Sequence, residues 1–190
     1  MPAHYALSDA AIVVVTVFGG TALLRNGQRL LAFAMACFGT AAAIGALRFG
    51  GGLQEELATL HSGSAQFLGF AGVLAVLSSC LFRAGGRDDV LRFVSILCVV
   101  GAIYLFVHPL LGPLLLLSVV ITLAVSLYRP VSSRHFWLVP LGSAIMLANA
   151  VFIRRASWLD ESMGWHAYHI LIAFALALLA MGFLSAKRTV

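Results

Sequence analysis

Two histidines one helical turn apart, His166 and His169, follow an acidic turn at Asp160 and Glu161 and open a long apolar segment. Residues three apart share a helix face, so both imidazoles could meet one ion. Histidine is a frequent zinc ligand, and a catalytic zinc ion takes three protein ligands and activates a bound water. The spacing therefore predicts a candidate zinc site at the start of this segment.

Other polar residues could complete that site. We predict His61 as the third metal ligand, and Asp9 or His108 are alternatives. Asp9 could instead act as a base in the reaction. Arg48 and Asn149 could orient an anionic or amide group of a substrate, because each offers hydrogen-bond donors.

The composition places these residues in a membrane. Of the 190 residues, 62% are hydrophobic and 10% are charged, against about 25% charged in a typical soluble domain. Helices satisfy their own backbone groups in lipid, and about 20 apolar residues cross the hydrocarbon core. We predict one all-α domain over 1–190, a polytopic bundle of seven transmembrane helices at about 6–24, 30–48, 61–82, 90–108, 111–128, 136–153 and 164–185.

The cations indicate the orientation of this bundle. Lysine and arginine total 12, and an N-out, C-in arrangement puts nine of them in inner loops, in line with the positive-inside rule. The nine are Arg25, Arg29, Arg83, Arg87, Arg92, Arg129, Arg134, Lys187 and Arg188. The predicted site residues then lie at the outer ends of their helices.

Small residues predict which helix face turns inward. From His166 and His169 the same face continues through alanines, whereas the opposite face is bulky. Helix contacts in membranes favour small residues, so the histidines should face the bundle interior. The alanines are Ala173, Ala177 and Ala180, and the bulky residues predicted to face lipid are Leu171, Phe174, Leu178 and Met181.

Two other classes of protein are disfavoured, a nucleic-acid-binding protein and a disulfide-stabilised protein. The net charge of +5 comes from residues that flank the spans, and no basic run is long enough to follow a nucleic-acid backbone. We therefore expect no nucleic-acid partner. Cys37, Cys80 and Cys98 all fall inside predicted spans, so we expect packing residues rather than a disulfide framework.

The polar residues at the outer ends of the predicted helices also have a simpler interpretation. All these residues lie near the membrane surface, where long polar side chains reach water at little cost. Asp9 or Asp160 could cap a helix N-terminus, and Trp158, Trp165 and Tyr168 could form an interfacial aromatic belt. On that interpretation the residues perform no chemistry.

Seven spans with an outer N-terminus, and an acidic residue before His166-Ala167-Tyr168-His169, resemble the alkaline ceramidase and adipoQ-receptor-like superfamily. Ser8-Asp9 and Gly45 are similar to residues in small bacterial seven-span proteins. The resemblance implies a hydrolase, in many members zinc-dependent, that acts on lipid amides. It also implies residence in a bacterial inner membrane. The superfamily spaces its last-span histidines four apart, whereas here they are three apart.

Two functional hypotheses remain open at this stage. The first is a metal-dependent hydrolase-like site at the outer face that acts on membrane lipids. The second is a non-catalytic membrane module, either an accessory subunit or a protein that binds lipid or a partner helix. A partner membrane protein or a second copy of the chain would then be the ligand.

Overall fold

The structure is a computed structural model, and it describes residues 3–82, 87–106, 108–128, 135–154 and 156–186. These residues form helices and no strand, which confirms the all-α prediction. The α-helices are α1 (Tyr5–Arg25), α2 (Arg29–Gly50), α3 (Ala58–Leu81), α4 (Arg87–Phe106), α5 (Leu111–Tyr128), α6 (Leu138–Ala148) and α7 (Glu161–Ser185). A 3-10 turn, His108–Leu110, precedes α5, and a π-helix, Asn149–Ile153, extends α6.

Each predicted span coincides with a helix to within three residues at either end, if the π-helix Asn149–Ile153 is counted with α6. Five helices, α1, α2, α3, α5 and α7, are long and apolar enough to cross a bilayer, so the fold is consistent with a membrane protein. The apolar parts of the other two are shorter, Leu91–Phe106 and Leu138–Ile153. A rise of about 1.5 Å per residue makes segments of that length shorter than a hydrocarbon core of about 30 Å.

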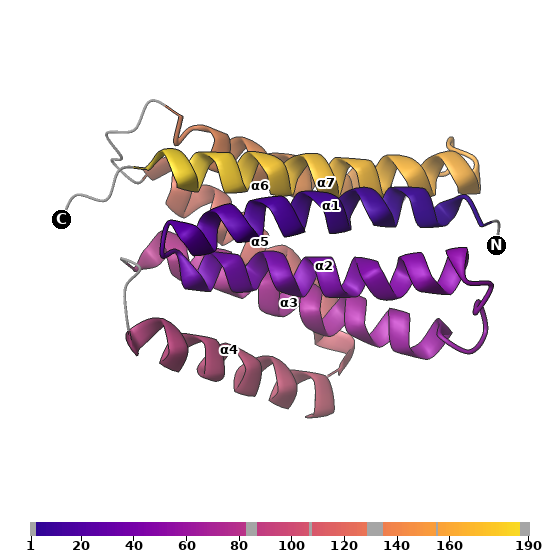
Figure 1. The fold of residues 1–190 in the computed structure, drawn as a ribbon, viewed down its shortest axis with the longest axis horizontal. Coiled ribbons are helices and arrows are strands. Elements are labelled where there is room, and N and C mark those ends of the chain that lie inside the picture. Colours follow the sequence, from indigo (N-terminus) through magenta and orange to yellow (C-terminus); the bar gives the residue numbers. More distant parts are fainter. Residues whose placement is uncertain (1–2, 83–86, 107, 129–134, 155, 187–190) are drawn as a thin grey trace.

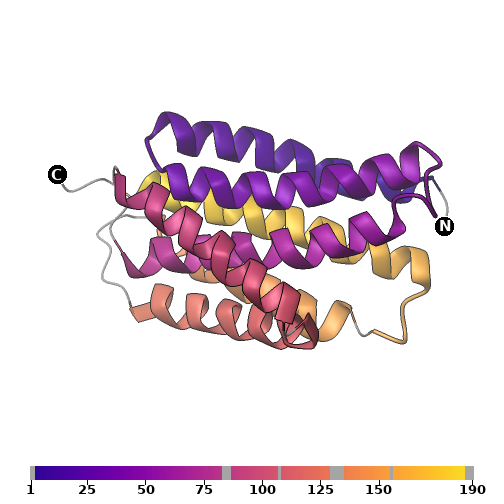
Figure 2. The ribbon, with the colours of Figure 1, turned by 90° about the horizontal axis from the view of Figure 1, so that it is seen from below.

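Six helices form a closed ring. In order around it, α1 contacts α2, α2 contacts α3, and the ring continues through α5, α6 and α7 back to α1. Helix α4 lies outside the ring against α2 and α3, and crosses them obliquely (Figures 1 and 2). Because α1 and α7 begin at the same end of the bundle (Figure 1), their first turns can build one site together.

Small residues allow the ring helices to approach closely. A Cβ atom added at Gly19 would lie 3.2 Å from Ala180 Cβ, which joins α1 to α7. One added at Gly142 would lie 2.8 Å from the carbonyl oxygen of Ala175, which joins α6 to α7. The interior between these contacts is apolar and includes the fully buried Met35. This is the packing by small residues that membrane helices favour.

For the apolar residues of α7, the face prediction is confirmed at four positions and wrong at one, while Leu171 and Ala177 are partly exposed and do not decide it. Ala173 and Ala180 are buried, and Phe174 and Met181 are about half exposed. Leu178, predicted to face lipid, is instead 5% exposed. The reason is that α7 packs against both α1 and α6, so its buried face is wider than one stripe.

None of the three cysteines forms a disulfide, and Cys37 and Cys80 are buried while Cys98 is exposed on α4. Cys37 and Cys80 therefore fit the expected packing role, whereas Cys98 does not, because α4 lies outside the ring and leaves its side chain exposed. Six of the cations lie outside the described residues, and the orientation argued from them stays a prediction. They are Arg83, Arg129, Arg134, Arg155, Lys187 and Arg188.

Candidate functional site

Asp9 is the centre of the polar end of the bundle. It lies in the second turn of α1 and its exposed fraction is 1%. Its Oδ1 is 3.4 Å from Nε2 of His169 on α7. Within the described part of the chain, Oδ2 has no hydrogen-bond partner although it is buried. A buried carboxylate oxygen without a donor is costly, and in native proteins it usually has a role.

The contacts of His169 fix where its protons lie. Its Nδ1 is 2.8 Å from the backbone oxygen of Trp165. A carbonyl oxygen only accepts, so Nδ1 carries the hydrogen. In a neutral ring Nε2 would then present a lone pair to the carboxylate of Asp9, and two acceptors 3.4 Å apart repel unless a proton lies between them. This geometry therefore favours a pair that holds one proton more than a neutral imidazole and a carboxylate would.

Arg48 fixes the proton of a second imidazole in the same way. Its Nε–H donates to the backbone oxygen of Gln54 at 2.8 Å, and its guanidinium lies 5.0 Å from the ring centre of Phe49. Its Nη1 is 3.4 Å from Nδ1 of His61. A guanidinium has no acceptor, so Nδ1 of His61 accepts, and in the neutral ring Nε2 carries the hydrogen.

Gly45 on α2 allows these groups to meet. A Cβ atom at Gly45 would lie 2.5 Å from Asp9 Oδ2 and 2.8 Å from His61 Nε2. These two atoms are thus at most 5.3 Å apart, the sum of the two distances. Glycine is required here because any side chain would occupy the place of the two polar atoms.

Three rings, Tyr5, Phe49 and Trp165, form an aromatic cap over this centre. Trp165 stacks on His169 with ring centres 4.3 Å apart and on Tyr5 at 5.2 Å. Phe49 meets Trp165 edge-on at 5.1 Å. Tyr5 and Phe49 are at most 2% exposed, so these two rings of the cap are buried together with Asp9. Such stacked and edge-on pairs stabilise the closed arrangement.

His166, predicted as a metal ligand, makes its ring contacts elsewhere. Its ring centre is 5.1 Å from that of His4 and 5.6 Å from that of Tyr5, while His4 Nε2 lies 2.9 Å from Ser162 Oγ. Across the described ranges, no group of three or more His, Cys, Asp or Glu side chains could hold a metal ion. This donor set does not fit a three-ligand zinc site. Within the described residues, the predicted ligands His61, His166 and His169 thus do not come together as a zinc site, and we derive no reaction step through zinc.

Asn149 contacts the backbone of α7 rather than Asp9. It lies at the start of the π-helix and is 1% exposed. Its Nδ2 donates to the backbone oxygen of Tyr168 at 2.8 Å. The amide therefore joins the end of α6 to α7. π-Helices are rare and often occur at functional sites, and this one turns Asn149 inward.

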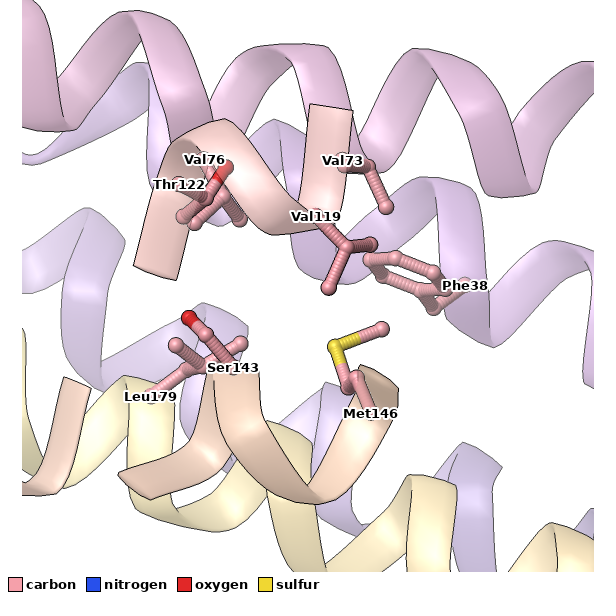
Figure 3. A pocket seen from close by; sticks show the side chains of 8 residues that line it. All are labelled: Phe38, Val73, Val76, Val119, Thr122, Ser143, Met146 and Leu179. Atoms are coloured by element: carbon pink, nitrogen blue, oxygen red, sulfur yellow. The ribbon is translucent and has the colours of Figure 1, made fainter. Parts of the chain in front are cut away.

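A small cavity lies deeper, between α2, α3, α5, α6 and α7 (Figure 3). Its volume of about 10 Å³ is close to the space of one water molecule. The hydroxyls of Thr122 and Ser143 line it, but both donate to backbone oxygens of their own helices, Ser118 and Val139. The rest of the lining is apolar, so a substrate site at this depth is not supported.

Comparison with known proteins adds no assignment. No family model, no curated protein and no solved structure matches this chain. The geometry around Asp9 is therefore the basis on which a function is proposed.

Of the six predicted site residues, the structure brings four together, Asp9, Arg48, His61 and His169. His166 and Asn149 contact other groups. Sequence reasoning missed Trp165 as a partner of His169, although its position four residues earlier is the spacing of helix neighbours. It assigned Trp165 only to an aromatic belt.

Proposed function

We propose that the chain crosses a bacterial inner membrane seven times, with its N-terminus outside and its C-terminus inside. Support comes from the start of α1 and the end of α7 at opposite ends of the bundle (Figure 1) and from the excess of cations at the inner end. Tilt or local thinning of the bilayer accommodates the shorter helices α4 and α6 at modest cost.

Cysteine labelling tests this orientation. In a Cys98→Ala background, Glu55→Cys is expected to react with a membrane-impermeant maleimide added to intact cells. Asn26→Cys should react only after the membrane is opened. Both positions are exposed, at opposite ends of the bundle, and the remaining cysteines are buried. The reverse pattern would contradict the N-out orientation.

We propose further that the protein is a membrane hydrolase that cleaves an amide or ester bond of a lipid at the outer face. The observation that carries this proposal is the contact of 3.4 Å between Asp9 Oδ1 and His169 Nε2, together with the second oxygen of Asp9, which is buried and has no donor among the described residues. From the contact of His169 Nδ1 with a backbone oxygen we infer that this pair holds an additional proton. Acid–base catalysis needs one group to take a proton and another to deliver one. In the Asp9–His169 pair, the carboxylate of Asp9 can take a proton and the additional proton of the pair can be delivered.

The reaction requires no metal step to balance. A water oxygen bonds to the carbonyl carbon while one water proton passes to Asp9, and the carbon–nitrogen or carbon–oxygen bond then breaks. The leaving amine or alcohol takes a proton from the pair. A lipid carbonyl reaches Asp9 only when the aromatic cap moves, because Asp9 and Phe49 are each 1% exposed.

Fatty-acid release from reconstituted protein tests the proposal. The protein is placed in vesicles that contain an N-acyl sphingoid lipid, or in matched vesicles in which a phospholipid ester is the acyl donor. We expect fatty acid from at least one vesicle type at a rate above that of protein-free vesicles. Folded protein that releases none from either would contradict the hydrolase.

A groove between α1 and α2 favours a second candidate, the non-catalytic lipid-binding or partner-binding module. Its volume is about 430 Å³ and its lining is mainly small, including Gly20, Ala36 and Gly39. Small residues that face lipid allow another helix or an acyl chain to approach closely. This candidate predicts that Asp9→Asn still binds the lipid or the partner helix normally. Replacing a small residue of the groove with a bulky one should abolish that binding.

A further inference from the structure

The polar end of the bundle contains an acceptor without a partner and, close to it, a donor on a second helix, and both atoms lie near Gly45. The acceptor is Asp9 Oδ2, which is buried and lacks a donor among the described residues. The donor is the Nε2–H of His61, whose position follows from the contact of Nδ1 with Arg48. Both atoms lie over Gly45, at most 5.3 Å apart.

We infer that a water molecule binds over Gly45, between Asp9 Oδ2 and His61 Nε2. Hydrogen bonds to a water oxygen span about 2.7–3.2 Å, so one water can reach both atoms. It would donate one hydrogen to the carboxylate and accept the imidazole hydrogen. Buried water typically has two to four such partners, and it relieves polar groups that the protein leaves unsatisfied.

Arg48 is a positioning residue for this water. The guanidinium is held by the backbone of Gln54 and by the ring of Phe49, so it presents a fixed donor to His61. Without that donor either nitrogen of His61 could carry the proton. The Nε2 lone pair would then face Asp9 in part of the molecules, and water would lose its donor.

The position suits a nucleophile. A water that donates to Asp9 Oδ2 has its proton already directed at the base, and its oxygen is free to attack a carbonyl. This role as nucleophile rests on the proposed hydrolase, whereas the presence of the water does not.

Water-edited NMR of protein labelled with nitrogen-15 histidine, in lipid bilayers, tests the inference. His61 signals are assigned by their loss in His61→Gln. In the wild type we expect Nε2 of His61 to be protonated, Nδ1 to be unprotonated, and the Nε2 proton to show a cross-peak to water. Arg48→Met should convert His61 from this one tautomer to a mixture of both.

Gly45→Ala should abolish the cross-peak, because the added Cβ would lie 2.5 and 2.8 Å from the two polar atoms. Gly69→Ala on α3 is the matched control, since its Cβ would meet only Leu115 at an ordinary 3.8 Å. Protonation of His61 at Nδ1, or no water cross-peak in the wild type, would overturn the inference. If Gly45→Ala does not fold, the inference is tested by the water cross-peak of the wild type and by the His61 tautomers of Arg48→Met. A water cross-peak in protein that releases no fatty acid would reject the proposed hydrolase but not the bound water.

Discussion

Asp9→Asn is expected to reduce fatty-acid release about 10²- to 10⁴-fold, the usual contribution of a positioned acid or base. The amide has the shape of the carboxylate but cannot take a proton from water. It also cannot share a proton with His169, whose Nε2 lies 3.4 Å from Asp9 Oδ1. The measurement is the initial rate of fatty-acid release from the reconstituted vesicles.

The matched control for this loss is Asp160→Asn. Asp160 lies at the same end of the bundle, is exposed, and accepts a hydrogen bond from the backbone N–H of Met163 as the N-cap of α7. Asparagine caps helices about as well as aspartate, so stability should hardly change. Release should therefore remain near the wild-type rate. An Asp9→Asn variant that keeps more than about a tenth of that rate would contradict the acid–base assignment.

Gly142→Ala is expected to destabilise the bundle by about 1–3 kcal/mol, the usual cost of overpacking a core. The added methyl would lie 2.8 Å from the backbone oxygen of Ala175 and 3.1 Å from Leu179. Backbone cannot move aside as a flexible side chain can, so α6 and α7 must separate. The measurement is the free energy of unfolding in detergent micelles.

Gly112→Ala is the contrasting substitution. Gly112 has no atom within 4 Å of the added methyl, so the change carries no packing penalty. Alanine inside a helix is more stable than glycine by about 0.5–1 kcal/mol, but the following Pro113 disfavours the helical conformation of alanine, so we expect only a small net change. A decrease in stability for Gly112→Ala as large as that for Gly142→Ala would show that the close approach of α6 and α7 is not the cause.

The apolar segments predicted the helices well because membrane spans depend on hydrophobicity and length, which are local properties of the sequence. The apolar segments did not predict the order in which six of the helices form a closed ring. Which helices contact one another depends on the fit of side chains across the bundle, as between Gly142 and α7. The error at Leu178 has the same origin, since one face of α7 packs against two neighbours.

The candidate site was predictable in part. Asp9, His61 and His169 are expensive to bury in a membrane, so their residue types alone indicated a role. The direction of each ring was not predictable. His166 shares a helical face with His169, yet its ring contacts are with His4 and Tyr5. One turn of helix changes the partner that a side chain meets at the end of a bundle.

The most direct test of the account is the nitrogen-15 spectrum of His169. If Asp9 and His169 share an additional proton, Nδ1 will be protonated. The signal of Nε2 will then shift on Asp9→Asn and stay unchanged on Asp160→Asn. An unprotonated Nδ1, or an Nε2 signal that Asp9→Asn leaves in place, would contradict the account.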